Sequence, residues 1–266
     1  MAADRSRRPR ARVLALGVML GLGVGATLCH ANPILEEPRK MIDQQPRSAT
    51  LDARQQAIVP VAAFAAAGDM ARLNGALEQG LGAGLTVNEL KEVLVQLYAY
   101  AGFPRSLNAL GELMKVVEAR RARGIHDPQG PAPQRPVPTG EALLAAGTAN
   151  QTRLSGAPVR GALFEFAPAA DTFLKTHLFG DIFERDNLDW RSRELATVSM
   201  LAMLAGAESQ LQSHLRISMN VGITKGQLTQ LGQVLEQGAR RMQGRACALR
   251  WRRSMRLRSN GGSTTP

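Results

Sequence analysis

The feature that most constrains this chain is the same order of motifs in its two halves. Leu-Asp-x-Arg occurs at residues 51–54 and again at 188–191. Gly-[Leu/Ile]-Thr-x-x-[Glu/Gln]-Leu occurs at 84–90 and again at 222–228, so the two motifs recur at offsets of 137 and 138 residues. A matched order over such distances predicts two copies of one structural unit, with a single residue inserted in the second copy.

Both copies carry the periodicity and the end signals of helices. Their apolar residues follow three- and four-residue spacing, and Thr86 forms a capping box with Glu89. Pro104 stands at the start of a further helix at about 105–122, where its missing donor costs little. Only 4% of the residues are aromatic, which suits closely packed helices better than a sheet. We predict an all-α fold in which two tandem helical repeats, 51–123 and 188–237, pack as a bundle.

The segments outside the repeats are predicted from their composition. Residues 1–31 combine five Arg, an apolar run and a small residue at Ala31, which indicates a secretory signal peptide cleaved near Ala31, with an uncleaved anchor as the alternative. Export predicts a periplasmic or secreted protein without a stable membrane span after cleavage. Residues 32–50 form an N-terminal arm, 124–187 a linker and Phe-rich connecting segment, and 238–266 a basic, disordered tail.

Charge and cysteine content exclude several functions. The net charge of +11 comes from the two ends, and residues 32–237 are close to neutral, so no specific nucleic-acid partner is predicted, although the tail could hold phosphates nonspecifically. Signal cleavage leaves Cys247 as the single cysteine, which excludes an intramolecular disulfide and a thiolate zinc site. The histidines show no metal-ligand spacing, so we predict no metal.

One polar pair distinguishes the second repeat from the first. Glu194 and His214 lie toward the apolar faces of two helices joined near Gly206, whereas the first repeat has Ala57 and Ala76 at the matching positions. Burying such groups is costly unless they find partners, so the pair is either a satisfied core pair or an acid–base site. At about 1.5 Å per residue, Glu194 lies ~18 Å and His214 ~12 Å from the turn, which leaves open whether they touch or flank a substrate.

Two stretches carry a resemblance to a known family. Tyr100-Ala-Gly-Phe-Pro-x-x-x-Asn108-Ala-Leu110 follows a helix, and Arg193-Glu-Leu-Ala-Thr precedes Gln-Leu-x-Ser-His214 and Met-Asn-x-Gly-x-Thr. These motifs resemble the carboxymuconolactone decarboxylase family and its alkylhydroperoxidase relatives over about residues 45–237. The resemblance implies an all-helical homo-oligomer, a trimer or a hexamer, whose sites lie between helices or subunits.

The peroxidase branch of that family fits the residues poorly. Its members use two Cys three residues apart and a His four residues beyond the second, and the two Cys positions hold Ala207 and Gln210 here. Peroxide reduction by thiols needs a thiolate nucleophile. A peroxiredoxin or alkylhydroperoxidase label could follow from family membership, but the residues argue against that reaction.

The decarboxylase branch resembles the chain better, and it implies removal of CO₂ from a carboxylated lactone without a cofactor. Such chemistry needs cations for the substrate carboxylates and an acid that protonates the resulting carbanion or enolate. We expect His214 to donate the proton and Glu194 either to orient His214 or to hold its proton. The expected carboxylate partners are Arg191 and Arg193, with Lys175 and His177 as second candidates. The alternative is an exported oligomer of the same fold that binds a ligand without turnover.

Overall fold

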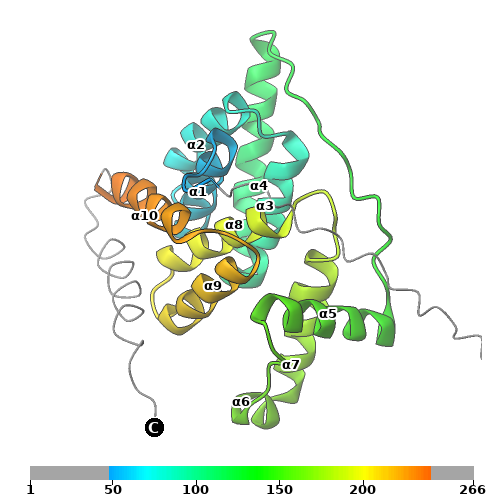
Figure 1. Ribbon diagram of the computed structural model, residues 1–266. Helices are drawn as coiled ribbons and strands as arrows, with labels where there is room; N and C mark the ends of the chain where they lie inside the picture. Colours follow the sequence, from blue (N-terminus) through cyan, green and yellow to red (C-terminus); the bar gives the residue numbers. More distant parts are fainter. Residues whose placement is uncertain (1–47, 241–266) are drawn as a thin grey trace, which may run out of the picture. The chain divides into compact units, whose positions relative to one another are not determined.

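The computed structural model describes residues 48–240, with side chains to residue 238. Within this range the regular secondary structure is helical, which confirms the predicted all-α fold (Figure 1). None of the helices in this range is long and apolar enough to cross a membrane. The predicted signal peptide at 1–31, most of the predicted arm at 32–50 and nearly all of the predicted tail lie outside the described residues.

The first repeat forms four helices whose ends match the local sequence signals. They are α1 (Ala53–Ala67), α2 (Met70–Gly82), α3 (Val87–Gln96) and α4 (Tyr98–Ala122). Asp52 caps α1, and Thr86 and Glu89 form the predicted capping box of α3. At Gly102 the backbone of α4 turns to a φ of 81°, and Pro104 follows this kink. Glycine adopts such a φ without steric cost, so the chain changes direction here.

The second repeat reproduces the first three of these helices. They are α8 (Trp190–Met203), α9 (Glu208–Asn220) and α10 (Lys225–Arg240). Asp189 caps α8 as Asp52 caps α1. Thr224 and Gln227 form the capping box of α10, with the amide N of each residue 3.0–3.2 Å from the side-chain oxygen of the other. The predicted correspondence between the repeats is therefore confirmed helix by helix.

The two repeats share one hydrophobic core. The equivalent helices α1 and α8 make the most extensive contact of any helix pair in the described residues. The buried side chains of this core come from both repeats and include Ile58, Leu90, Leu97, Leu195, Val198 and Leu215. Because each repeat buries its apolar face against the other, the two repeats form one domain.

The connecting segment is helical and only partly buried. It contains α5 (Gly140–Ser155), α6 (Ala162–Phe166), α7 (Pro168–Phe173) and a π-helix, η1 (Leu174–Ile182). Phe179 and Phe183 join a second apolar cluster with Ile217 of α9, and Tyr98 and Tyr100 of the first repeat pack against it. These two Phe pack the connecting segment against both repeats. Phe166 and Phe173 do not, because their exposed fractions are 88% and 61%.

The linker before α5 lies against the first repeat. Backbone oxygens of Pro128 and Gln129 accept hydrogen bonds from the amides of Val87 and Asn88 in the first turn of α3. These amides have no partner within the helix. The linker therefore completes the cap that Thr86 begins.

Candidate acid–base site between the repeats

The centre of the site is a hydrogen bond between Glu194 of α8 and His214 of α9. His214 Nδ1 lies 2.9 Å from Glu194 Oε2. The Glu194 side chain is fully buried, and the His214 side chain is 10% exposed. The helical spacing left open whether Glu194 and His214 touch or flank a substrate, and in the structure they touch.

The contact determines which histidine nitrogen can meet a ligand. An ionised carboxylate only accepts hydrogen bonds, so Nδ1 of His214 is the donor to Glu194. This leaves Nε2 as the nitrogen that can exchange a proton with a substrate. The second carboxylate oxygen, Glu194 Oε1, is buried and has no hydrogen-bond partner among the described residues. The carboxylate can thus both orient the imidazole and stabilise its positive charge.

Tyr100 of the first repeat contributes to the same site. Its ring stands edge-on to the His214 imidazole, with ring centroids 5.8 Å apart and an interplanar angle of 80°. The Thr197 hydroxyl donates to the Tyr100 oxygen at 3.2 Å. Burial, together with the nearby Glu194 carboxylate, raises the pKa of Tyr100 well above its usual value, so the phenol is neutral. Sequence reasoning used Tyr100 only as part of a family motif and missed its place beside His214.

Arg193 does not serve as the predicted partner of a substrate carboxylate. Its side chain is fully buried and pairs with Glu92 of α3, with Nη2 of Arg193 3.0 Å from the carboxylate. Nη1 of Arg193 donates to Gln96 Oε1 at 3.3 Å. Because Glu92 and Gln96 bind this guanidinium inside the protein, Arg193 holds α8 against α3. The prediction that it binds a substrate carboxylate is therefore wrong.

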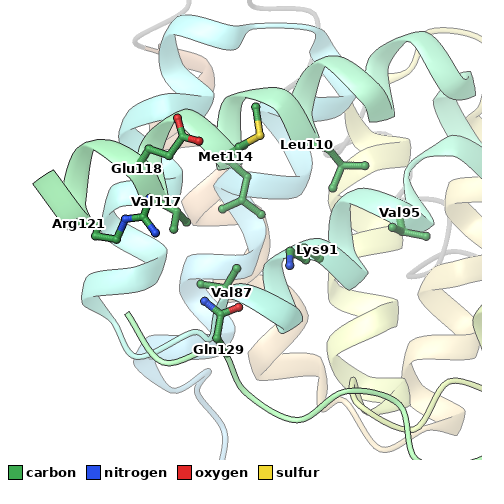
Figure 2. Close-up of a pocket in the computed structure, with 10 residues that line it drawn as sticks. Val87, Lys91, Val95, Leu110, Met114, Val117, Glu118, Arg121 and Gln129 are labelled. Carbon is green, nitrogen blue, oxygen red and sulfur yellow. The ribbon is translucent and has the colours of Figure 1, made fainter. Parts of the chain in front are cut away.

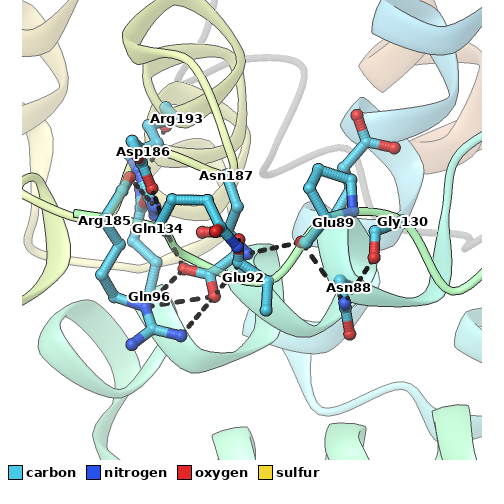
Figure 3. Close-up of polar contacts among 12 residues, drawn as sticks. Asn88, Glu89, Glu92, Gln96, Gly130, Gln134, Arg185, Asp186, Asn187 and Arg193 are labelled. Atoms are coloured by element: carbon cyan, nitrogen blue, oxygen red, sulfur yellow. Dashed lines mark hydrogen bonds and ion pairs between the residues drawn. The ribbon is translucent and has the colours of Figure 1, made fainter. Parts of the chain in front are cut away.

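Glu92 collects further donors around the same contact (Figure 3). Arg185 binds it through two nitrogens, with the shortest distance 2.7 Å, and Asn187 donates to it at 3.2 Å. Burial alone would raise the pKa of Glu92, but the Arg185 and Arg193 guanidinium groups outweigh it and hold the pKa below its usual value. Glu92 is therefore ionised inside the protein.

The other three residues that were predicted to bind the substrate carboxylate have different surroundings. Arg191 is half-buried at the start of α8, where Nη2 donates to Gln227 at 3.3 Å and Nε has no partner among the described residues. Lys175 pairs with Asp171, and His177 Nδ1 lies 2.9 Å from Asp181. The partners of Lys175 and His177 are acidic residues of their own connecting segment, so the structure assigns neither of them to the Glu194–His214 pair.

A separate pocket of about 490 Å³ lies between α3 and α4 (Figure 2). Most of its lining is apolar, and Lys91, Glu118 and Arg121 are its charged residues. It is formed by the first repeat and Gln129 of the linker, and it contains none of the residues predicted to be catalytic. Glu194 and His214 therefore lie outside this pocket.

Comparison with known proteins agrees with this architecture. A 4-carboxymuconolactone decarboxylase from Acinetobacter baylyi is 33% identical over 69 residues, a stretch that covers 26% of this chain and 51% of that enzyme. The chain thus spans about half the length of this relative. Residues 43–114 and 168–239 each match the carboxymuconolactone decarboxylase family. Since these two stretches make up more than half of the sequence, the protein belongs to the carboxymuconolactone decarboxylase family, as a tandem two-copy form.

Proposed function

We propose that the protein is a cofactor-free decarboxylase of a carboxylated lactone or a similar small organic acid. The observation that carries the proposal is the buried hydrogen bond of 2.9 Å between Glu194 and His214. A carboxylate that holds one imidazole nitrogen leaves the other poised as a proton donor or acceptor. The name of the Acinetobacter relative supports a carboxylated lactone as the substrate class.

The reaction needs one bond cleavage and one proton transfer. The bond between the substrate carbon and its carboxylate breaks, CO₂ leaves, and the electron pair moves through the ring onto the lactone carbonyl oxygen. Protonated His214 then gives the Nε2 proton to carbon, while the Glu194 carboxylate stabilises the imidazolium before the transfer. A proton from solvent restores the imidazolium. The site thus supplies the acid, and the substrate supplies the electrons.

A cation beside this pair would hold the substrate before it reacts. Arg191 stands three residues before Glu194 on α8, which places the two on neighbouring positions of one helix face. Its Nε is buried without a partner among the described residues, and a guanidinium binds carboxylates in a bidentate manner. We therefore assign the substrate carboxylate to Arg191 and leave Lys175 and His177 out of the site.

The test is a decarboxylation assay with purified protein and 4-carboxymuconolactone, followed by loss of substrate absorbance and release of CO₂. We expect His214→Gln and Glu194→Gln to lower kcat by about 10²- to 10⁴-fold, the usual contribution of a positioned acid. His177→Gln is the matched control, since His177 has an acidic partner at the same 2.9 Å but is exposed on η1. Wild-type protein that consumes no carboxylated lactone between pH 5 and pH 9 would overturn the proposal.

The same assay distinguishes the alternative functions that the sequence analysis left open. A ligand-binding protein without turnover would bind the lactone in calorimetry and release no CO₂. Peroxide reduction is not proposed, because Ala207 and Gln210 stand where the peroxidase branch has its two Cys. Export and assembly into a trimer or hexamer stay proposals, which the N-terminal mass of the mature chain and light scattering would test.

A further inference from the structure

A chain of hydrogen bonds runs from the charged cluster around Glu92 to Tyr100, whose ring contacts His214 of the acid–base pair. Arg193, the first residue of this chain, determines which group donates at each step. Arg193 has only donors on its side chain and only an acceptor at its carbonyl oxygen. Gln96 touches both, with Oε1 3.3 Å from the guanidinium and Nε2 3.0 Å from the carbonyl. The amide of Gln96 therefore has one satisfactory orientation, with its nitrogen facing away from the guanidinium.

The same direction continues through the next two residues. Gln96 Nε2 donates to Thr197 Oγ1 at 2.7 Å. Because this hydroxyl oxygen accepts from Gln96, its own proton is free to point to the Tyr100 oxygen, 3.2 Å away. Tyr100 is thus the acceptor of the chain and keeps its own O–H proton. Glu194 Oε1 does not take that proton, since it has no hydrogen-bond partner among the described residues.

We propose that the Tyr100 hydroxyl is a catalytic donor, which hydrogen-bonds the oxygen of the substrate that becomes negatively charged when CO₂ leaves. This inference rests on the proposed decarboxylase function and deepens it. His214 delivers a proton to carbon, and Tyr100 stabilises charge on the lactone carbonyl oxygen without giving its proton away. Gln96, Thr197 and Arg193 act through Tyr100 and are positioning residues.

The geometry and the surroundings of Tyr100 suit this role. The phenol ring contacts the imidazole that would deliver the proton, so one small ring could meet both groups. The hydroxyl is anchored on α8 by Thr197, one turn from Glu194. A donor that is already oriented costs no reorganisation when charge develops, and removing such a donor typically slows a reaction by about 10²- to 10³-fold.

The experiment uses a stable mimic of the charged intermediate. Tetronate, the anion of tetronic acid, carries its charge on the oxygens of a five-membered lactone, and 2(5H)-furanone is its neutral counterpart. We expect Tyr100→Phe to weaken tetronate binding by about 10- to 100-fold in calorimetry, as expected for a hydrogen bond to a charged group, and to change furanone binding little. The matched control is Tyr98→Phe, because Tyr98 stacks on Phe103 with ring centroids 4.5 Å apart and is not one of the described residues that form the hydrogen-bond chain.

The direction of the chain has its own test in Gln96→Glu. A carboxylate at this position accepts from Thr197, so Thr197 would accept from Tyr100 and withdraw its proton from the site. Gln96→Glu should then lose tetronate affinity as Tyr100→Phe does. Thr197→Val should lose part of it and Thr197→Ser should retain it, with thermal melting of every variant as the check on folding.

The outcomes separate this inference from the proposed function. Turnover that is lost in His214→Gln but unchanged in Tyr100→Phe would refute the role of Tyr100 and leave the decarboxylase proposal intact. Selective loss of tetronate binding in Tyr100→Phe would support an anion-stabilising hydroxyl even if the wild type released no CO₂. Wild type that binds no tetronate, or a Tyr100→Phe variant that loses tetronate and furanone equally, would overturn the inference.

Discussion

The guanidinium of Arg193 lies 3.0 Å from the carboxylate of Glu92, 101 residues earlier in the other repeat. Arg185, from the segment between the repeats, binds the same carboxylate. Two buried charges are thus compensated across the boundary between the copies. Because an isolated buried charge is very costly, each repeat depends on the other for its electrostatics as well as for its core.

Glu92→Gln should strongly destabilise the protein. It leaves the buried Arg193 without its anionic partner, and removing one member of a buried pair typically costs about 3–5 kcal/mol. Unfolding in urea, followed by circular dichroism, measures the loss. Glu78→Gln is the control, since Glu78 is 29% exposed in its ion pairs with Arg120 and Arg123 and should cost less than about 1 kcal/mol. Equal losses of unfolding free energy in the two variants would show that the Glu92 cluster stabilises the protein no more than an exposed ion pair does.

The contribution of Glu92 should also depend on pH. Burial opposes ionisation of Glu92, but Arg185 and Arg193 prevail, so its pKa is lower in the folded protein than in the unfolded chain. The stabilisation is therefore complete above the unfolded Glu pKa of about 4.3 and is lost as pH falls through the lower folded value. The difference in unfolding free energy between wild type and Glu92→Gln should narrow from pH 7 toward pH 3, and a constant difference would contradict this assignment.

Gly147→Ala should loosen the contact between α5 and η1. A Cβ atom at Gly147 would fall on the backbone oxygen of Lys175 in η1, so the two helices could not keep their present approach. We expect a loss of about 1–3 kcal/mol and faster hydrogen exchange across residues 140–182. Gly111→Ala in α4 is the control, because its Cβ would meet open space and should stabilise the helix by up to about 1 kcal/mol. Unchanged exchange in Gly147→Ala would mean that the helices separate at little cost.

Local signals explain why much of the fold was predictable. The capping boxes at Thr86 and Thr224 and the apolar spacing of α3 and α8 act within a few residues of themselves, so they can be read from the chain. The repeat then predicted which helices correspond. Local signals could not show the π-helix η1, nor that Phe166 and Phe173 of the connecting segment would be exposed.

The sequence by itself determined that the second repeat alone has an acid and an imidazole directed to its apolar interior, because helical spacing decides on which face Glu194 and His214 lie. Only the tertiary structure decided what the neighbouring residues do. Arg193 and Glu194 are adjacent on α8, yet Glu92 engages the first and His214 the second. Tyr100 likewise reaches the site from the other repeat. The partner of a buried polar group is chosen by the packing of helices distant in sequence, and that packing is not encoded in any local pattern.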